Sequence, residues 1–260
     1  MLTRHVPWGP MRIDVWSDIA CPWCYIGKRR LESALEGFEH RDEVEVVYRS
    51  FELDPSAPVP PVESSTEALA RKYGGGPEQI AAMQARVAEL AAGEGLDYQL
   101  DRTLHLNTRN AHRLLHLALQ VGGPQLQAAL KEALLGAYFV QARDVTDKVL
   151  LEQIAEGVGL DPTAVRRVLA SDEFDAEVSA DVDQARAYGA SGVPFFVVDG
   201  RYGVAGAQPT EVLAGAVERA WSERQPALQT ITGTTTDGEG TTTADGTGVC
   251  GPDGCEVPQR

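Results

Sequence analysis

The N-terminal part of the chain combines two short apolar runs with a helical repeat. Residues 12–16 and 44–51 are rich in apolar, β-branched or aromatic side chains and predict two strands. Residues 28–35, between them, have helical spacing. A proline-rich stretch over residues 54–62 ends the second strand. The pattern therefore predicts a β-α-β unit.

A long middle segment, from residue 64 to residue 189, has the spacing of helices with recognisable ends. One apolar stripe runs along Leu126, Leu130, Leu134 and Ala137. Asp and Thr side chains favour helix starts, whereas Gly favours helix ends. The expected N-caps are Thr146 and Asp161, and the expected C-terminal stops are Gly122, Gly157 and Gly189. We therefore expect a helical subdomain inserted into the α/β unit.

Strand-like segments return after the helices. Residues 193–198 and 201–205 predict two strands joined by a two-residue Asp-Gly hairpin, and residues 209–221 predict a final helix. From Ser222 onward the chain is rich in Thr, Gly and Asp, and it offers too little apolar surface to offset its ordering entropy. We expect this tail to be flexible.

The composition and net charge of the chain argue against a membrane-spanning protein and against a nucleic-acid-binding protein. The chain has 260 residues, 43% of them hydrophobic, and it contains no apolar run near the ~20 residues needed to cross a bilayer. Its net charge of -15, from 38 acids against 23 bases, makes nucleic acid and anionic membrane unlikely partners. Residues 1–10 lack the continuous apolar stretch of a secretory signal. We therefore expect a cytoplasmic protein.

The four cysteines form two close pairs, Cys21 with Cys24 and Cys250 with Cys255. Local pairs in a reducing compartment indicate redox or metal chemistry rather than a structural disulfide framework. A structural zinc site needs four ligands, and no second Cys-x-x-Cys or His pair stands at the usual spacing. We expect neither a metal nor a cofactor, although two incidental buried thiols remain an alternative.

The first pair has the placement of a redox dithiol. Cys21-Pro22-Trp23-Cys24 stands where a strand leads into a helix, and free N–H groups and the helix dipole there favour a thiolate. We expect Cys21 to be the nucleophile and Cys24 the resolving thiol that attacks a mixed disulfide at Cys21. Asp18 is either a proton relay for Cys24 or an exposed loop acid, and both interpretations stay open.

The chain combines the dithiol motif, the helical insertion, and two later segments, Gly192-Val193-Pro194-Phe195 and Ala205-Gly206-Ala207-Gln208. With these features it resembles the DsbA-type thioredoxin superfamily, in particular its FrnE-like branch. The resemblance covers residues 12–221. It implies a cis Val193–Pro194 bond facing the dithiol, with Trp23, Val193 and Pro194 forming a groove for an extended substrate strand. An ordinary trans proline opening an edge strand is the alternative.

The resemblance also sets the expected fold and its parts. It implies an α/β thioredoxin-like fold with a helical insertion domain and a flexible C-terminal tail. The expected divisions are residues 11–63 and 190–221 for the two thioredoxin-like parts, 64–189 for the insertion, and 222–260 for the tail. A recurrent helix entry of these relatives has counterparts here to which we assign only capping and packing, namely Asn107, Thr108, Ala111, His112 and Arg113.

We expect a thiol-disulfide oxidoreductase or isomerase that acts on protein disulfides, with chaperone activity and a role in oxidative-stress tolerance as further expectations. Glutathione or a thioredoxin-type reductant is an expected partner. The alternative is a glutathione-dependent transferase or a hydroxychromene-carboxylate-type isomerase acting on a small molecule. Those relatives generally keep a serine or lack one cysteine in the motif, whereas this chain keeps both sulfurs. A non-catalytic chaperone or metal-responsive binding protein is a second rival.

The second cysteine pair lies in the tail, around a turn signal. Pro252 and Asp253 fit the centre of a turn, which would place Cys250 opposite Cys255 within disulfide reach. A tether of about 28 residues reaches about 30 Å as a random coil. We therefore expect a second redox pair that exchanges with Cys21, against the alternative of a local disulfide or inert thiols.

Overall fold

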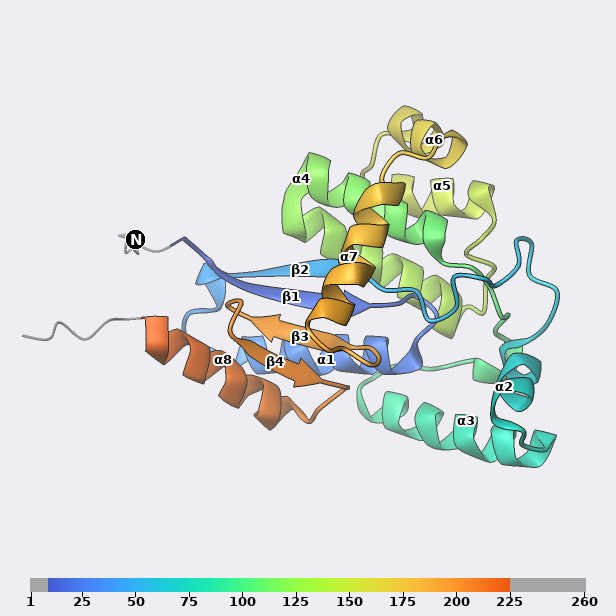
Figure 1. The fold of residues 1–260 in the computed structure, drawn as a ribbon, viewed down its shortest axis with the longest axis horizontal. Helices are drawn as coiled ribbons and strands as arrows, with labels where there is room; N and C mark the ends of the chain where they lie inside the picture. Colours follow the sequence, from blue (N-terminus) through green and yellow to red (C-terminus); the bar gives the residue numbers. More distant parts are fainter. Residues whose placement is uncertain (1–8, 225–260) are drawn as a thin grey trace, which may run out of the picture. The chain divides into compact units, whose positions relative to one another are not determined.

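The computed structural model describes residues 9–224, and its centre is a four-stranded sheet (Figure 1). The strands lie in the order β2-β1-β3-β4. β1 pairs with β2 in parallel, and the other two pairings are antiparallel. Val15 in the middle of β1 stands opposite Tyr48 of β2 and Phe196 of β3. The strands are β1 Met11–Ser17, β2 Val44–Ser50, β3 Phe195–Val198 and β4 Tyr202–Ala205.

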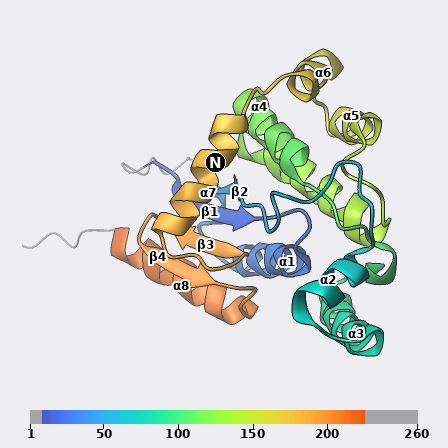
Figure 2. The ribbon, with the colours of Figure 1, turned by 45° about the vertical axis from the view of Figure 1, so that its right-hand side comes forward.

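Within the described part of the chain, eight α-helices surround the sheet. α1 Pro22–Glu36 follows β1, and α8 Thr210–Arg224 follows β4 and packs beside α1. Six helices lie between β2 and β3 in the chain, and two views show α2 and α3 together on the side where α1 begins (Figures 1 and 2). They are α2 Ser65–Tyr73, α3 Pro77–Gly93, α4 Arg109–Leu135, α5 Lys148–Gly157, α6 Pro162–Ala170 and α7 Asp175–Ala187.

One expected helix start differs in the structure. Asp147, not Thr146, is the N-cap of α5, because its carboxylate accepts the N–H of Val149 at 2.9 Å while the Thr146 hydroxyl donates to Asp144. α4 is interrupted at Gly123, whose φ of 70° and ψ of -168° are non-helical, so its first part ends at the expected stop beside Gly122 and a second part begins at Pro124. The expected N-cap Asp161 is confirmed, as are helix ends at Gly157 and just before Gly189.

α4 covers the outer edge of β2. Gln127 of α4 is fully buried, and its side-chain amide accepts the Tyr48 N–H at 2.8 Å and donates to the Tyr48 carbonyl oxygen at 2.9 Å. The side chain therefore satisfies two backbone groups that a neighbouring strand would otherwise pair. This contact fixes α4 against the sheet.

The expected α/β fold with helices between its two halves is confirmed. The expected tail starts too early, because α8 continues through residues 222–224. The rest of the tail, with its pair Cys250 and Cys255, lies outside the described residues. The divisions at residues 63, 189 and 221 stay predictions. Within residues 9–224, no helix is both long and apolar enough to traverse a bilayer.

Candidate active site

The dithiol lies at the start of α1. Cys21 is the N-cap residue, Pro22 opens the helix, and the Cys24 N–H donates to the Cys21 carbonyl oxygen at 3.0 Å. Both cysteines are free thiols and are 4% and 2% exposed, respectively. The hydroxyl of Tyr98 donates to the Pro22 carbonyl oxygen at 2.8 Å and holds this turn from outside the helix.

The segment before β3 lies directly against the dithiol. The Cys21 thiol donates to the Val193 carbonyl oxygen across 3.4 Å, and the Val193–Pro194 peptide bond is cis. Pro194 is buried against α1, where a Cβ added at Gly27 would stand 2.9 Å from Pro194 Cγ. The structure therefore brings together Cys21 and Val193, which the sequence places in distant segments.

The electrostatic surroundings of Cys21 differ from the sequence expectation of an ionised thiol. The hydrogen bond with Cys24 and burial raise the pKa of the Cys21 thiol well above its ordinary value, and the Asp18 carboxylate adds to this. The backbone N–H of Cys24 acts in the opposite direction and lowers it. Cys21 does stand at a helix N-terminus, but its burial and its two neighbours outweigh that position.

A cavity of about 890 Å³ opens beside the dithiol. Cys21, Trp23, Asp18 and Val193 line it together with side chains of α2, α3 and the π-helical turn Gly136–Val140. Trp23 is 38% exposed at this site. The cavity therefore gives a substrate sulfur access to Cys21 and offers apolar surface next to it. Charged and polar side chains also line it, among them Asp54, Arg71, Lys72 and His105. A cavity of this size with a mainly apolar lining and some polar groups is typical of ligand-binding sites.

Asp18 is buried beside Cys21 rather than exposed. Its carboxylate accepts the Leu53 N–H at 2.8 Å and lies 3.3 Å from His112 Nε2. Burial raises the pKa of Asp18, but the hydrogen bonds from His112 and Leu53 outweigh this and the net direction is downward. Burial lowers the pKa of His112, so the neutral ring donates to Asp18 from Nε2. The relay role of Asp18 stays a prediction.

Sequence reasoning assigns no function to Tyr98 and only packing to His112. Both turn out to contact the dithiol loop, Tyr98 at Pro22 and His112 at Asp18. His112 could have been noticed from the sequence, because it lies at the start of a helix whose residues resemble those of related families. Tyr98 had no signal, because it precedes a short 3-10 turn in an irregular segment.

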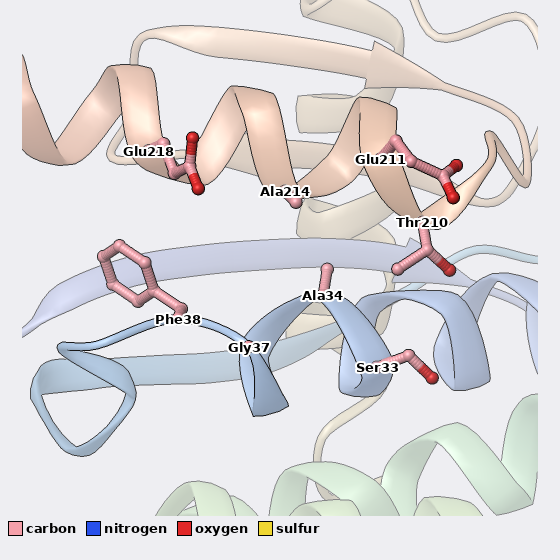
Figure 3. Close-up of a pocket in the computed structure, with 8 residues that line it drawn as sticks. All are labelled: Ser33, Ala34, Gly37, Phe38, Thr210, Glu211, Ala214 and Glu218. Atoms are coloured by element: carbon pink, nitrogen blue, oxygen red, sulfur yellow. The ribbon is translucent and has the colours of Figure 1, made fainter.

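A smaller cavity of about 180 Å³ lies between α1 and α8 (Figure 3). Its polar lining includes Glu211 and Glu218 of α8 and Ser33 of α1. No residue of the dithiol motif lines it. Within residues 9–224, no group of three or more His, Cys, Asp or Glu side chains is placed to hold a metal ion.

The arrangement of dithiol, cis proline and sheet agrees with a known protein family. The model of the DSBA-like thioredoxin domain matches residues 12–218. The chain belongs to this family. The DsbA-like chain is 46% identical to a probable DsbA oxidoreductase from Streptomyces coelicolor, with a TM-score of 0.78 over 96% of this chain and 100% of that one. It is also 27% identical to YwbO of Bacillus subtilis over 161 residues, which is 61% of this chain and 72% of YwbO.

Two more distant structures share the fold of this DsbA-like protein. One is 2-hydroxychromene-2-carboxylate isomerase, with 17% identity and a TM-score of 0.64 over 82% of this chain and 98% of that one. The other is the cytosolic disulfide reductase DsbM from Pseudomonas aeruginosa with GSH, with 16% identity and a TM-score of 0.53 over 82% and 96%. At these identities the likeness concerns the fold alone. The FrnE-like assignment stays a prediction.

Proposed function

We propose that this DsbA-like protein is a cytoplasmic thiol-disulfide oxidoreductase or isomerase that acts on protein disulfides through Cys21 and Cys24. The contact of the Cys21 thiol with the Val193 carbonyl oxygen, at the mouth of an apolar cavity, is the observation that carries the proposal. The Cys21 thiolate attacks one sulfur of a substrate disulfide and forms a mixed disulfide, while the substrate S–S bond breaks and the first substrate sulfur leaves with the electron pair. Cys24 then attacks Cys21, and the second substrate sulfur leaves with the electron pair.

The backbone at Val193 supports a polypeptide substrate. When Cys21 enters a mixed disulfide, its thiol proton is gone and the Val193 carbonyl oxygen is released from the 3.4 Å contact. An extended substrate segment carries N–H groups that fit such an acceptor. Trp23 and the apolar side of the cavity then contact the side chains that flank the substrate cysteine.

The surroundings of Cys21 favour reduction or isomerisation over net oxidation. A strongly oxidising dithiol owes its potential to a reduced form stabilised as a thiolate. Burial and the hydrogen bond with Cys24 raise the pKa of Cys21 and work against that stabilisation. A reducing role fits the proposed cytoplasmic location, and the similar fold of DsbM, named a cytosolic disulfide reductase, is compatible with it.

Trapping the mixed disulfide tests the proposal. The full-length Cys24→Ser variant, mixed with a protein that carries a disulfide, should accumulate a covalent adduct that a thiol reductant reverses. Cys21→Ser should form none. Peptide mapping of the adduct by mass spectrometry should place the new bond at Cys21. No adduct with Cys24→Ser, or equal adduct with Cys21→Ser, would rule out the proposed nucleophile.

Glutathione is the proposed alternative partner, as a reductant of the Cys21–Cys24 disulfide or as the cosubstrate of a small-molecule reaction. The fold shared with an isomerase and with DsbM with GSH supports this candidate. The two functions separate on the Cys24→Ser variant. Glutathione-dependent conversion of a small molecule by Cys21 survives this change, whereas unaided reduction of a protein disulfide stops.

Two further proposals concern other parts of the chain and its wider role. We propose Cys250 and Cys255 as a second redox pair that exchanges with Cys21, and removal of residues 245–260 should then slow turnover. We also propose chaperone activity in oxidative stress. Suppression of aggregation of an unfolding client by the double variant Cys21→Ser, Cys24→Ser would support a chaperone function independent of the dithiol.

A further inference from the structure

The cavity beside the dithiol also carries a group of charged side chains. Arg71 and Lys72 of α2, together with Asp54 and His105, line the same cavity as Cys21. Both bases lie in the last turn of α2, and both are exposed. A substrate that reaches Cys21 through this cavity therefore meets side chains that can recognise charge.

Three of these charged side chains already have partners within the chain. Both terminal nitrogens of the Arg71 guanidinium donate to the Glu63 carboxylate. The ring of His105 lies between two carboxylates, with Nδ1 3.0 Å from Glu63 and Nε2 3.0 Å from Asp54. Arg71, His105 and Asp54 are therefore engaged with one another through Glu63 and have little capacity left for a substrate.

Lys72 differs from the other charged residues of this group. Its Nζ lies 5.8 Å from the centre of the Tyr73 ring, and none of the carboxylates within residues 9–224 forms an ion pair with it. An ammonium group carries three donors and no acceptor. A carboxylate of a substrate can therefore bind Lys72 without first displacing a partner.

Apolar surface surrounds this cation. Tyr73 of α2 and Met83 of α3 are exposed and line the cavity, as does Trp23 in the dithiol motif. α2 contains no buried residue, so its apolar side chains stay available for contact. Apolar contacts reduce the screening of a charge pair by water. The combination fits an acidic side chain that is flanked by apolar residues.

The charge beside the reacting sulfur has the opposite sign. The Asp18 carboxylate lines the cavity together with Cys21 and belongs to the same loop. Like charges repel, so an acidic side chain directly next to the attacked cysteine faces an unfavourable charge. An acidic side chain farther along the substrate can instead reach Lys72 on α2. The position of the acidic residue in the substrate therefore matters as well as its presence.

We propose that Lys72 binds an acidic side chain of the client protein, so that disulfides with Asp or Glu near the attacked cysteine react preferentially. This inference rests on the proposed function and names a substrate class within it. The net charge of -15 otherwise repels acidic clients. Lys72 offsets this repulsion at the site itself. Glutathione also carries carboxylates, so the test includes both sources.

A competition between two substrates tests the inference. The full chain with Cys24→Ser, Cys250→Ser and Cys255→Ser keeps Cys21 as its one thiol. Two symmetric peptide disulfides, identical except for Glu or Gln near the cysteine, compete for Cys21 at low conversion. Each reaction joins Cys21 to one peptide sulfur and releases the other peptide as a thiol. Mass spectrometry of the adducts gives the ratio of the two rates, with the Glu or Gln moved in turn along the peptide.

An exposed ion pair predicts a modest preference that depends on salt. We expect the Glu peptide to win by about 2-fold to 5-fold at its best position in low salt, and the preference to fade at about 1 M salt. Lys72→Met should bring the ratio close to one. Lys72→Glu should invert it in favour of Gln. Because both peptides compete for the same molecules, the ratio does not depend on the folded fraction of a variant.

Arg86 of α3 supplies the matched control. It is exposed and does not line the cavity, so Arg86→Met changes the net charge as Lys72→Met does but leaves the site intact. The parental ratio should persist in Arg86→Met. Equal losses in both variants would assign the preference to net charge and overturn the role of Lys72, as would a parental ratio of one at every position.

Oxidised glutathione is the second arm of the test. Slower reaction of Lys72→Met with oxidised glutathione, combined with an unchanged peptide ratio, would assign the carboxylate to glutathione and overturn the preference for acidic clients. Absence of any peptide adduct at Cys21 would instead contradict the proposed function. The two failures are therefore distinguishable, because only the second abolishes reaction with the neutral Gln peptide.

Discussion

The Cys21 thiol donates a hydrogen bond to the carbonyl oxygen of Val193, a residue 172 positions later in the chain and 3.4 Å away. β1 and β3 make this contact possible, because their antiparallel pairing brings the segment before β3 beside the loop that follows β1. The sheet thus aligns the proposed nucleophile with the backbone that we propose to hold its substrate. The first prediction concerns the state of this thiol.

Alkylation of Cys21 should depend on pH in a way set by Cys24. The hydrogen bond with Cys24 and burial raise the pKa of Cys21, so its reaction with iodoacetamide should keep accelerating beyond the ordinary titration range of a thiol. Cys24→Ala removes the first of these causes and should shift the profile to lower pH. Rates measured by mass spectrometry at Cys21 check this, and a plateau already at neutral pH in the parent protein would contradict it.

Gly27 should be intolerant of a side chain. A Cβ at this position stands 2.9 Å from Pro194 Cγ and 3.2 Å from Phe196 Cζ. Gly27→Ala should therefore lower the free energy of unfolding by about 1–3 kcal/mol and slow disulfide exchange, because Pro194 is displaced from α1. Denaturant unfolding and the trapping assay measure the two effects.

The matched control for Gly27 is Gly215 of α8, which is exposed and has no atom within 4 Å of an added Cβ. Gly215→Ala should stabilise the protein by about 0.5–1 kcal/mol, as expected for a helix interior. Equal effects of the two substitutions would mean that the contact with Pro194 has no energetic consequence.

Folding stability should fall in mild acid because of His112. Burial lowers the pKa of His112 below its ordinary 6.5, so the unfolded chain binds a proton that the folded protein excludes. The free energy of unfolding should therefore decrease as the pH drops below about 6.5. His112→Gln, which keeps an N–H donor toward Asp18, should reduce this slope in urea unfolding series. His40→Gln is the control and should retain it.

Gln127 should matter far more than its neighbour Gln125. Gln127→Leu leaves the Tyr48 N–H and carbonyl oxygen without their partner, at a cost of about 1–3 kcal/mol for each buried group. Gln125 is exposed on the same helix, so Gln125→Leu should change stability by less than about 0.5 kcal/mol. Similar unfolding midpoints for the two variants would contradict the assigned role.

Local patterns predicted the secondary structure because each signal concerns near neighbours. The runs at residues 12–16 and 44–51 became β1 and β2. The Asp-Gly pair lies in the turn between β3 and β4, but the turn also includes Arg201 because Val198 pairs with Tyr202, so it is one residue longer than expected. The error at Thr146 has a local cause as well. Thr146 and Asp147 are adjacent, and either side chain can cap a helix. Asp147 is the N-cap of α5, because Thr146 is buried and hydrogen-bonded to Asp144.

The sequence predicted only those residues of the candidate site that belong to short, recognisable motifs. Cys21 and Cys24 are recognisable from their spacing, and Pro194 from its resemblance to a known loop. The burial of Gln127 and Lys131 on α4 was not predictable, because a polar residue beside the stripe of Leu126, Leu130 and Leu134 normally faces solvent. Here α4 covers both the edge of β2 and the end of β1, so the buried face is wider than the apolar stripe. The width of the buried face of α4 therefore depends on its contacts with β1 and β2, which the local sequence pattern does not contain.

The bond pair between Gln127 and Tyr48 also limits how this protein associates with other chains. A free strand edge is a template for strand addition and for edge-to-edge aggregation. At Tyr48 the outward N–H and carbonyl groups of β2 are already occupied by a side chain of α4. Another chain that met this edge could not pair its backbone with β2 at Tyr48, so the side chain of Gln127 protects this position of the sheet from edge-to-edge aggregation.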